Sequence, residues 1–242
     1  MIVAVSLVAT AILLKILVGE DPHLKLVPGL LAAVMALITT VAIEKMHSAV
    51  SVTEAIANVG LRAANRKQIP LVLIGTVPLV IGYLIIFFGL KVPPTLVDNA
   101  GFVLFKLVIA QGVVEEVVFR GLIFRHFRFR HSFWKSCVLS GVLFSLIHLV
   151  NLVNGISTEM LISVATSIVF GFILTFPLAL IFETGAGSII GGGILHLAID
   201  SLNCYKEIGE TGIPMTVYLV CLAVSSALIV WYGRKSINGF AS

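Results

Sequence analysis

The residues of this sequence best suited to chemistry are ionisable side chains inside strongly apolar segments. They are Glu115, Glu116, Arg120, His148, His196 and Asp200. A charge at bilayer depth costs roughly 3 kcal/mol on insertion scales, so an ionisable group within a spanning segment is a candidate functional residue. Carboxylates and imidazoles exchange protons and bind zinc. The chemistries to consider are therefore acid–base catalysis, a proton relay and a metal site.

The spacing within the first motif distinguishes two adjacent carboxylates. Glu116 and Arg120 are four residues apart, in the order that favours an ion pair on one face of an α-helix. Glu115 is rotated by about 100° from Glu116 in an α-helix, so it is expected to be available to a cavity. A purely structural ion pair between Glu116 and Arg120 is the alternative for this motif.

The two histidines lie at a depth similar to that of Glu115. His196 and Asp200 are also four residues apart and share a helix face, and Phe144 is spaced to pack beside the ring of His148. Glu115 and both histidines lie about ten to thirteen residues, or roughly 15–20 Å, from the cytoplasmic ends of their predicted spans. Each histidine on its own could simply form a hydrogen bond between two helices. The similar depth of Glu115 and both histidines favours a common function instead.

The elements that must position these residues are membrane-spanning helices. Hydrophobic residues make up 59% of the chain and charged residues 12%, whereas soluble domains carry roughly 25% charged residues. Because a spanning helix needs about 20 apolar residues, we predict an all-α, polytopic membrane protein with a bundle of about eight transmembrane helices. The predicted spans are 2–18, 26–43, 69–90, 100–124, 134–152, 160–182, 186–204 and 213–232. The chain is predicted to form a single transmembrane domain, 1–242, with its catalytic core at about 100–204.

Three further features bear on these helices. Pro78 and Pro177 fall inside predicted spans, where neighbouring groups must satisfy the freed carbonyls. The run Gly191–Gly193 removes side chains over nearly a turn, which permits close helix contact or access to the backbone from a cavity. The long connection at about 45–68 has a capping-box spacing at its start and helical apolar periodicity, so it is predicted to be an interfacial amphipathic segment.

The distribution of lysine and arginine predicts the orientation. With both termini in the cytoplasm of a multi-pass protein of the cell membrane, ten basic residues lie inside and three outside, and three lie within spans. The inner set is Lys45, Arg62, Arg66, Lys67, Arg125, Arg128, Arg130, Lys135, Arg234 and Lys235. The net charge of +4 is therefore explained by a cytoplasmic face on the lipid bilayer, and no nucleic-acid partner is expected.

The three motifs resemble those of a known family. EEVVFR (115–120), FSLIH (144–148) and HLAID (196–200) resemble the EExxxR, FxxxH and Hxxx(N/D) motifs of the CAAX-protease and bacteriocin-processing (CPBP or Abi) intramembrane proteases. All three occur in the family's order, and they cover residues 115–200. The resemblance implies an eight-helix bundle that hydrolyses a peptide bond of a membrane-embedded or lipidated protein or peptide.

Roles for individual residues follow from this resemblance. Glu115 with His148 would position and deprotonate the attacking water, and His196 with the residue at 200 would stabilise the oxyanion. Glu116 with Arg120 would brace the helix. The prenyl-protein proteases of the family have Asn at the last position, where this chain has Asp200, and this departure puts a prenylated substrate in doubt.

No cofactor is expected, but alternatives stay open. Zinc is one, with Glu115, His148, His196 and Asp200 as nitrogen and oxygen ligands. A non-catalytic membrane scaffold or immunity protein with the same fold is another, and a proton-coupled transporter is a third. The sequence contains no visible internal repeat of the kind that many transporters have. It does not indicate an oligomeric state.

Overall fold

The computed structural model describes residues 26–239 apart from 49, 155, 207 and 209–211. These residues are predominantly helical and include no β-strand; one isolated bridge joins Leu96 and Tyr205. Five of the described helices are long and apolar enough to cross a membrane. The prediction of an all-α, multi-pass membrane protein is therefore confirmed.

The helices lie close to the predicted spans. In chain order they are α2 (Leu26–Ser48), α3 (Val52–Asn58), η1 (Arg66–Gln68), α4 (Ile69–Leu84), η2 (Ile85–Gly89), α5 (Ala100–Lys106), η3 (Leu107–Phe124), α6 (Arg125–Arg128), α7 (Phe133–Leu146), η4 (Ile147–Asn154), α8 (Thr158–Thr184), α9 (Ile190–Asp200), η5 (Ser201–Cys204), α10 (Gly212–Gly233) and η6 (Arg234–Gly239). The five candidate spans are Leu30–Ser48, Arg66–Gly89, Phe133–Leu152, Thr158–Thr184 and Gly212–Gly233. The predicted span 2–18 lies outside the described residues.

Two predicted spans are present as helices but are not among those five. The span 100–124 is formed by α5 and η3 together, and η3 carries three of the charged candidate residues. The span 186–204 is formed by α9 and η5, of 11 and 4 residues. The segment 100–124 differs from the five long apolar helices in its charged residues, and the segment 186–204 differs from them in its short helices.

The chain divides into two compact units, which are described separately. Unit 1 comprises Met1–Val59 and Val117–Phe176, and unit 2 comprises Gly60–Glu116 and Pro177–Ser242. Consequently Arg120, Phe144 and His148 belong to unit 1, while both glutamates, His196 and Asp200 belong to unit 2.

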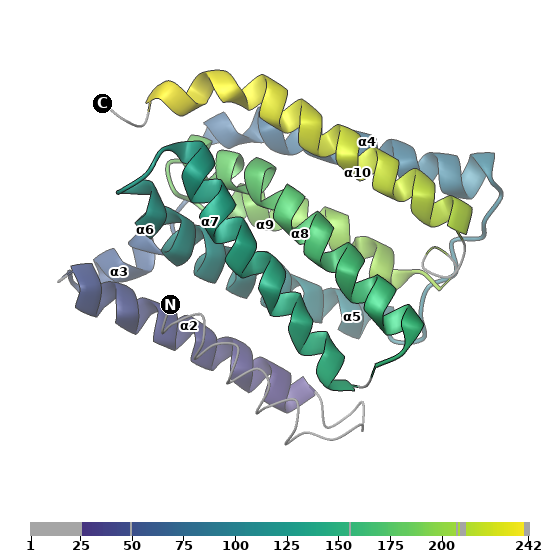
Figure 1. Ribbon diagram of the computed structural model, residues 1–242, viewed down its shortest axis with the longest axis horizontal. Helices are drawn as coiled ribbons and strands as arrows, with labels where there is room; N and C mark the ends of the chain where they lie inside the picture. Colours follow the sequence, from purple (N-terminus) through teal and green to yellow (C-terminus); the bar gives the residue numbers. More distant parts are fainter. Residues whose placement is uncertain (1–25, 49, 155, 207, 209–211, 240–242) are drawn as a thin grey trace. The chain divides into compact units, whose positions relative to one another are not determined.

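In unit 2, α4 and α10 pack side by side (Figure 1). A β-carbon at Gly75 would lie 2.6 Å from the Ile229 side chain, and one at Gly82 would lie 3.1 Å from Cys221 Sγ, so glycine allows the close approach. The pairing of early α4 with late α10 shows that the helices are antiparallel. The Ser225 hydroxyl of α10 donates to the Gly75 carbonyl of α4 at 2.7 Å, which adds a hydrogen bond between the two helices near Pro78.

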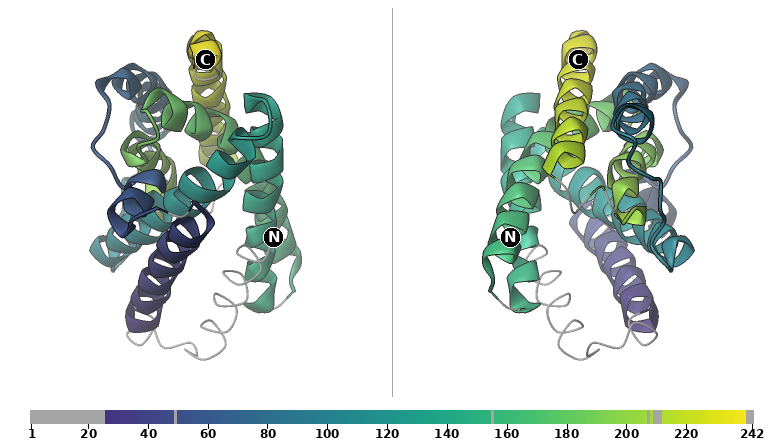
Figure 2. Two further views of the ribbon diagram at one scale, coloured as in Figure 1. Left: turned by 90° about the vertical axis from the view of Figure 1, so that its left-hand side faces the viewer. Right: turned by 90° about the vertical axis from the view of Figure 1, so that its right-hand side faces the viewer.

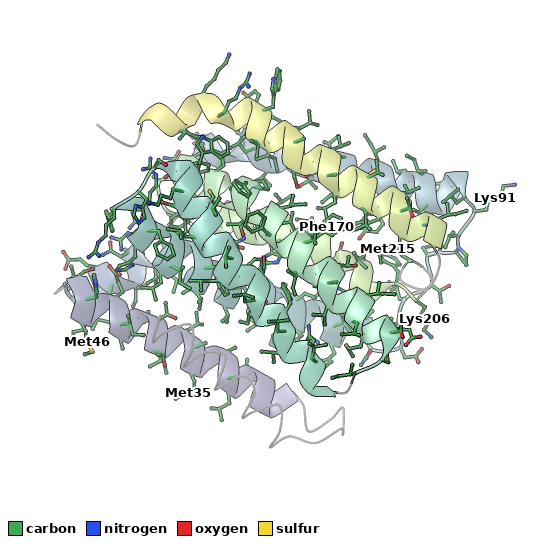
Figure 3. The ribbon with its side chains drawn as sticks, in the orientation of Figure 1. Met35, Met46, Lys91, Phe170, Lys206 and Met215 are labelled. Atoms are coloured by element: carbon green, nitrogen blue, oxygen red, sulfur yellow. The ribbon has the colours of Figure 1, made fainter. Side chains whose placement is uncertain are left out.

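In unit 1, the C-terminal end of α2 packs on α3 (Figures 1 and 2). The fully buried Glu44 carboxylate accepts hydrogen bonds from Ser48 Oγ, Asn58 Nδ2 and Arg125 Nη1 at 2.8–2.9 Å. Because Arg125 directly follows η3, this cluster ties the end of the glutamate-bearing helix to α2. Along α2, Met35 and Met46 project outward (Figure 3), with 48% and 82% of each residue exposed, as expected for a lipid-facing surface.

The predicted amphipathic segment at 45–68 contains the short helix α3. The capping box is present, since Ser51 and Glu54 exchange side-chain and backbone hydrogen bonds, and these bonds lower the pKa of Glu54. The helix ends at Asn58, however, because Gly60 adopts a positive φ of 92°. Ala55 and Val59 are buried within the protein, while the apolar side chains of Val52 and Ile56 are exposed.

The orientation of the chain can be tested at the connection between α6 and α7. Arg130 and Lys135 are exposed there and flank the exposed Ser132. We expect Ser132→Cys, in a background without the three native cysteines, to react with an impermeant thiol reagent only from the cytoplasmic side. The matched control is Lys91→Cys, because Figure 3 shows Lys91 at the same end of unit 2 as Lys206, both of which are predicted to be outside. Labelling of Ser132→Cys from the outer side of intact cells would contradict the orientation.

Candidate active site

The helix that carries both glutamates is not an α-helix. Over its 18 residues, Leu107–Phe124, η3 is π-helical, with backbone hydrogen bonds that span five residues instead of four. The α-helical periodicity assumed for Glu115, Glu116 and Arg120 is therefore wrong for this segment. The wider turn changes which side chains share a face, and π-helical turns are frequently found at functional sites.

Both adjacent carboxylates face a single imidazole from α9. Glu116 Oε1 lies 3.0 Å from His196 Nδ1, and Glu115 Oε2 lies 3.8 Å from His196 Nε2. The Glu116 side chain is fully buried, whereas 24% of the Glu115 side chain is exposed. The two carboxylates thus contact opposite nitrogens of the ring, and Glu115 is the one that solvent can reach.

Asp200 completes this group at the C-terminal end of α9. Its Oδ2 lies 3.3 Å from His196 Nε2, one turn along the helix, as the four-residue spacing predicts. Nδ1 of His196 faces Glu116, and Nε2 faces both Glu115 and Asp200. Unit 2 therefore brings together four of the predicted residues: Glu115, Glu116, His196 and Asp200.

The glycine run of α9 makes this close approach possible. A β-carbon at Gly192 would lie 2.7 Å from Glu116 Oε2, and one at Gly193 would lie 2.4 Å from the Gly112 carbonyl oxygen. The preceding residue, Gly191, donates its N–H to the buried Gln68 side chain at 3.2 Å. The bare helix face thus lies directly against η3, which is one of the two uses predicted for the run.

The remaining predicted residues form a separate group in unit 1. His148 lies on η4, directly after α7, and its ring packs edge-on against Phe144 with centroids 5.6 Å apart, which confirms the predicted packing. The Arg120 guanidinium lies 4.6 Å above the same Phe144 ring. A β-carbon at Gly171 of α8 would lie 3.2 Å from His148 Nε2, so bare backbone borders the imidazole.

Several residues of these groups could not be found from the motifs. Gly171 lies on another helix, within the apolar run 168–174, and Gly112 carries no motif of its own. The contact between Glu116 and His196 joins residues 80 positions apart, so no periodicity predicts it. The glycine run was the one signal that pointed to a close helix approach.

A short connection closes the end of unit 2 next to Asp200. Val97 N–H donates to the Cys204 carbonyl at 2.9 Å, and Lys206 N–H donates to the Thr95 carbonyl at 3.0 Å. The Lys206 ammonium, 2.7 Å from Asp98, holds the pKa of that carboxyl below its ordinary value. The segment that follows Asp200 is thereby fixed to the chain that precedes α5.

The side chains gathered at His196 are groups that exchange protons, so the arrangement is compatible with acid–base chemistry. Among the described residues, no group of three or more His, Cys, Asp or Glu side chains is arranged to hold a metal ion. In unit 2, His196 Nδ1 faces a buried carboxylate, which leaves Nε2 as the nitrogen nearest to Glu115 and Asp200.

Comparison with known families agrees with the motifs. The model of the family described as "Rce1-like: Type II CAAX prenyl endopeptidase Rce1-like" matches residues 98–202. This range contains all three motifs and coincides with the predicted catalytic core, so the resemblance to the CAAX-protease family is confirmed. A search of curated proteins found no match to the chain.

Proposed function

We propose that the chain is an intramembrane endopeptidase with a glutamate-activated water, because the model of the Rce1-like family of CAAX endopeptidases matches residues 98–202. The observation that carries the proposal is the geometry of Glu115 and Glu116 at His196. One carboxylate is buried and orients the ring, and its neighbour is partly exposed. In this pair, Glu116 positions the imidazole and Glu115 can contact water.

The first step is the activation of water. Glu115 accepts a proton from the water, and the oxygen attacks the carbonyl carbon of the scissile peptide bond. A carboxylate in a water-poor site favours its protonated form more than one in bulk water does, which improves it as a base near neutral pH. The family motif assigns His148 to the same water. Glu115, once protonated, returns the proton to the leaving amine.

The second requirement is a donor for the oxyanion. Glu116 fixes the orientation of His196 by accepting from Nδ1–H, so the imidazolium form presents Nε2–H beside Glu115. Donors fixed in advance where water is scarce stabilise developing negative charge more than they do in bulk water. Asp200 can add a second donor only in its protonated form. Arg120 would brace η3 through its contact with Phe144.

The substrate follows from the membrane location of the site and from the family. We propose a membrane-associated protein or peptide, with both termini of the enzyme in the cytoplasm and the protein in the cell membrane. The prenylated class is less well matched, because Asp200 replaces the Asn of the prenyl-protein proteases.

Cleavage by purified protein in detergent tests the proposal. The assay uses a panel of peptides with a C-terminal CAAX sequence, each with and without a prenyl group, and follows the products by mass spectrometry. Cleavage that persists in the presence of a chelator supports the glutamate mechanism. Absence of cleavage of every peptide by folded protein would instead favour a non-catalytic scaffold.

The role of Asp200 has its own test. We expect Asp200→Asn to keep or raise the cleavage rate, because an amide donates to the oxyanion without needing a proton. A zinc site held by Glu115, His148, His196 and Asp200 predicts the reverse, a marked loss of activity together with bound metal. The measurements are the cleavage rate and the zinc content of wild type and variant. Stoichiometric zinc in active wild type, lost with activity in Asp200→Asn, would contradict the metal-free mechanism.

A further inference from the structure

Three consecutive carbonyls at the C-terminal end of α9 accept hydrogen bonds from side chains. The Ser201 hydroxyl donates to Ala198 O at 2.7 Å, and Asn203 Nδ2 donates to Asp200 O at 2.9 Å. Between them, the Tyr218 hydroxyl of α10 donates to Ile199 O. The last four carbonyls of an α-helix lack intrahelical partners, and inside a membrane there is little water to replace them. Side chains therefore add hydrogen-bond donors to the carbonyls of the turn that carries Asp200.

A second tyrosine acts on the same turn from α4. Tyr83 OH lies 2.9 Å from Ser201 Oγ. The single hydroxyl proton of Ser201 is used at Ala198 O, so Tyr83 is the donor in this contact. The hydroxyl of Tyr83 therefore donates a hydrogen bond to the hydroxyl of Ser201, which in turn donates one to the carbonyl of Ala198.

The two tyrosines are themselves held by aromatic packing. The ring of Tyr83 lies 5.7–5.8 Å from the rings of Phe87, Tyr205 and Tyr218, and Phe87 lies 5.1 Å from Tyr205. Tyr218 is almost completely buried, at 1% exposure. Rings at these separations restrict one another, so the two hydroxyl groups are fixed at the end of α9 from two other helices.

We propose that Tyr83 and Tyr218 are positioning residues for Asp200, which they hold at His196 Nε2 through the last turn of α9. The inference rests on the proposed function, because Asp200 is assigned to the oxyanion site there. No motif of the family covers either tyrosine in this chain, and both lie outside residues 98–202. Neither tyrosine touches the reacting atoms in this account. Tyr218 acts on the carbonyl of Ile199, directly before Asp200, and Tyr83 acts on the side chain of Ser201, directly after it.

The test is removal of one hydroxyl at a time. We expect Tyr218→Phe to lower kcat about tenfold with little change in KM, because the ring still fills its site while the helix end shifts. Tyr83→Phe should have a smaller effect in the same direction, since it acts through Ser201. The matched control is Tyr232→Phe on the same α10, because Tyr232 is 52% exposed and should leave both constants unchanged.

A double-mutant comparison with Asp200 distinguishes an effect on the position of Asp200 from an effect on the stability of the whole protein. In an Asp200→Ala background, Tyr218→Phe should cause no further fall in kcat, although any change in unfolding temperature should persist. An unchanged kcat in both tyrosine variants, or an equal fall with and without Asp200, would overturn the inference while leaving the protease intact. Failure of the wild type to cleave any peptide would overturn the proposed function itself. If Tyr218→Phe does not fold, Tyr83→Phe and Ser201→Ala decide the same question.

Discussion

Glu115→Gln is expected to lower the cleavage rate by about 10²- to 10⁴-fold while the protein folds normally. Glutamine keeps the size of the side chain but cannot accept a proton from water. Glu115 is partly exposed, and its carboxylate oxygen lies 3.8 Å from His196 Nε2, so solvent can offset part of the loss of its charge. The measurement is kcat for the purified variant, together with its unfolding temperature.

Glu116→Gln is the matched control, because it makes the same change one residue further along. Glu116 is fully buried and 3.0 Å from His196 Nδ1, and breaking such a contact costs roughly 3–5 kcal/mol when one charge is left without its partner. We expect a lower unfolding temperature in this variant and a normal one in Glu115→Gln. Full activity of Glu115→Gln in purified protein would contradict the mechanism, and equal destabilisation by the two changes would contradict the distinction between them.

Much of the fold could be predicted because the membrane leaves few choices. Backbone groups in lipid must be satisfied internally, so long apolar runs indicate helices almost irrespective of their detailed sequence. The span predicted at 100–124 coincides with α5 and η3 together. The four-residue spacing of His196 and Asp200, and that of Phe144 and His148, correctly predicted side-chain contacts, because local spacing on a helical turn fixes local distance.

The site departed from prediction where the backbone itself departs from α-helical geometry. On an α-helix, Glu115 would be rotated by about 100° from Glu116. In the structure η3 is π-helical, and both glutamates face His196. The partner of Glu116 could not be anticipated either, because the contact depends on how closely α9 lies against η3. The grouping of His148 with Glu115 and the pairing of Glu116 with Arg120 stay predictions, as these residues lie in different units.

The closeness of α9 to η3 depends on one backbone contact. A β-carbon at Gly193 would lie 2.4 Å from the carbonyl oxygen of Gly112, a separation that real β-carbons do not show. The obstructing atom belongs to the backbone, so no side-chain rotation can relieve the clash. Seen from the other side, a β-carbon at Gly112 would lie 3.6 Å from Gly193 O, which is ordinary van der Waals contact. A larger residue is therefore expected to be tolerated at Gly112 but not at Gly193, although both glycines lie at the same helix contact.

Gly193→Ala is therefore expected to abolish cleavage and to lower the unfolding temperature strongly. The added methyl group must push α9 away from η3, and overpacking of this kind costs about 1–3 kcal/mol even where neighbours adjust. Because His196 lies one turn further along α9, the displacement also separates its imidazole from Glu116, and geometric changes of about 1 Å can reduce rates by 10²-fold. Gly112→Ala, the control from the facing helix, should keep most of the activity and stability. The two variants are compared by cleavage rate and thermal unfolding in the same detergent, and a Gly193→Ala protein as active and stable as Gly112→Ala would show that α9 does not depend on this contact.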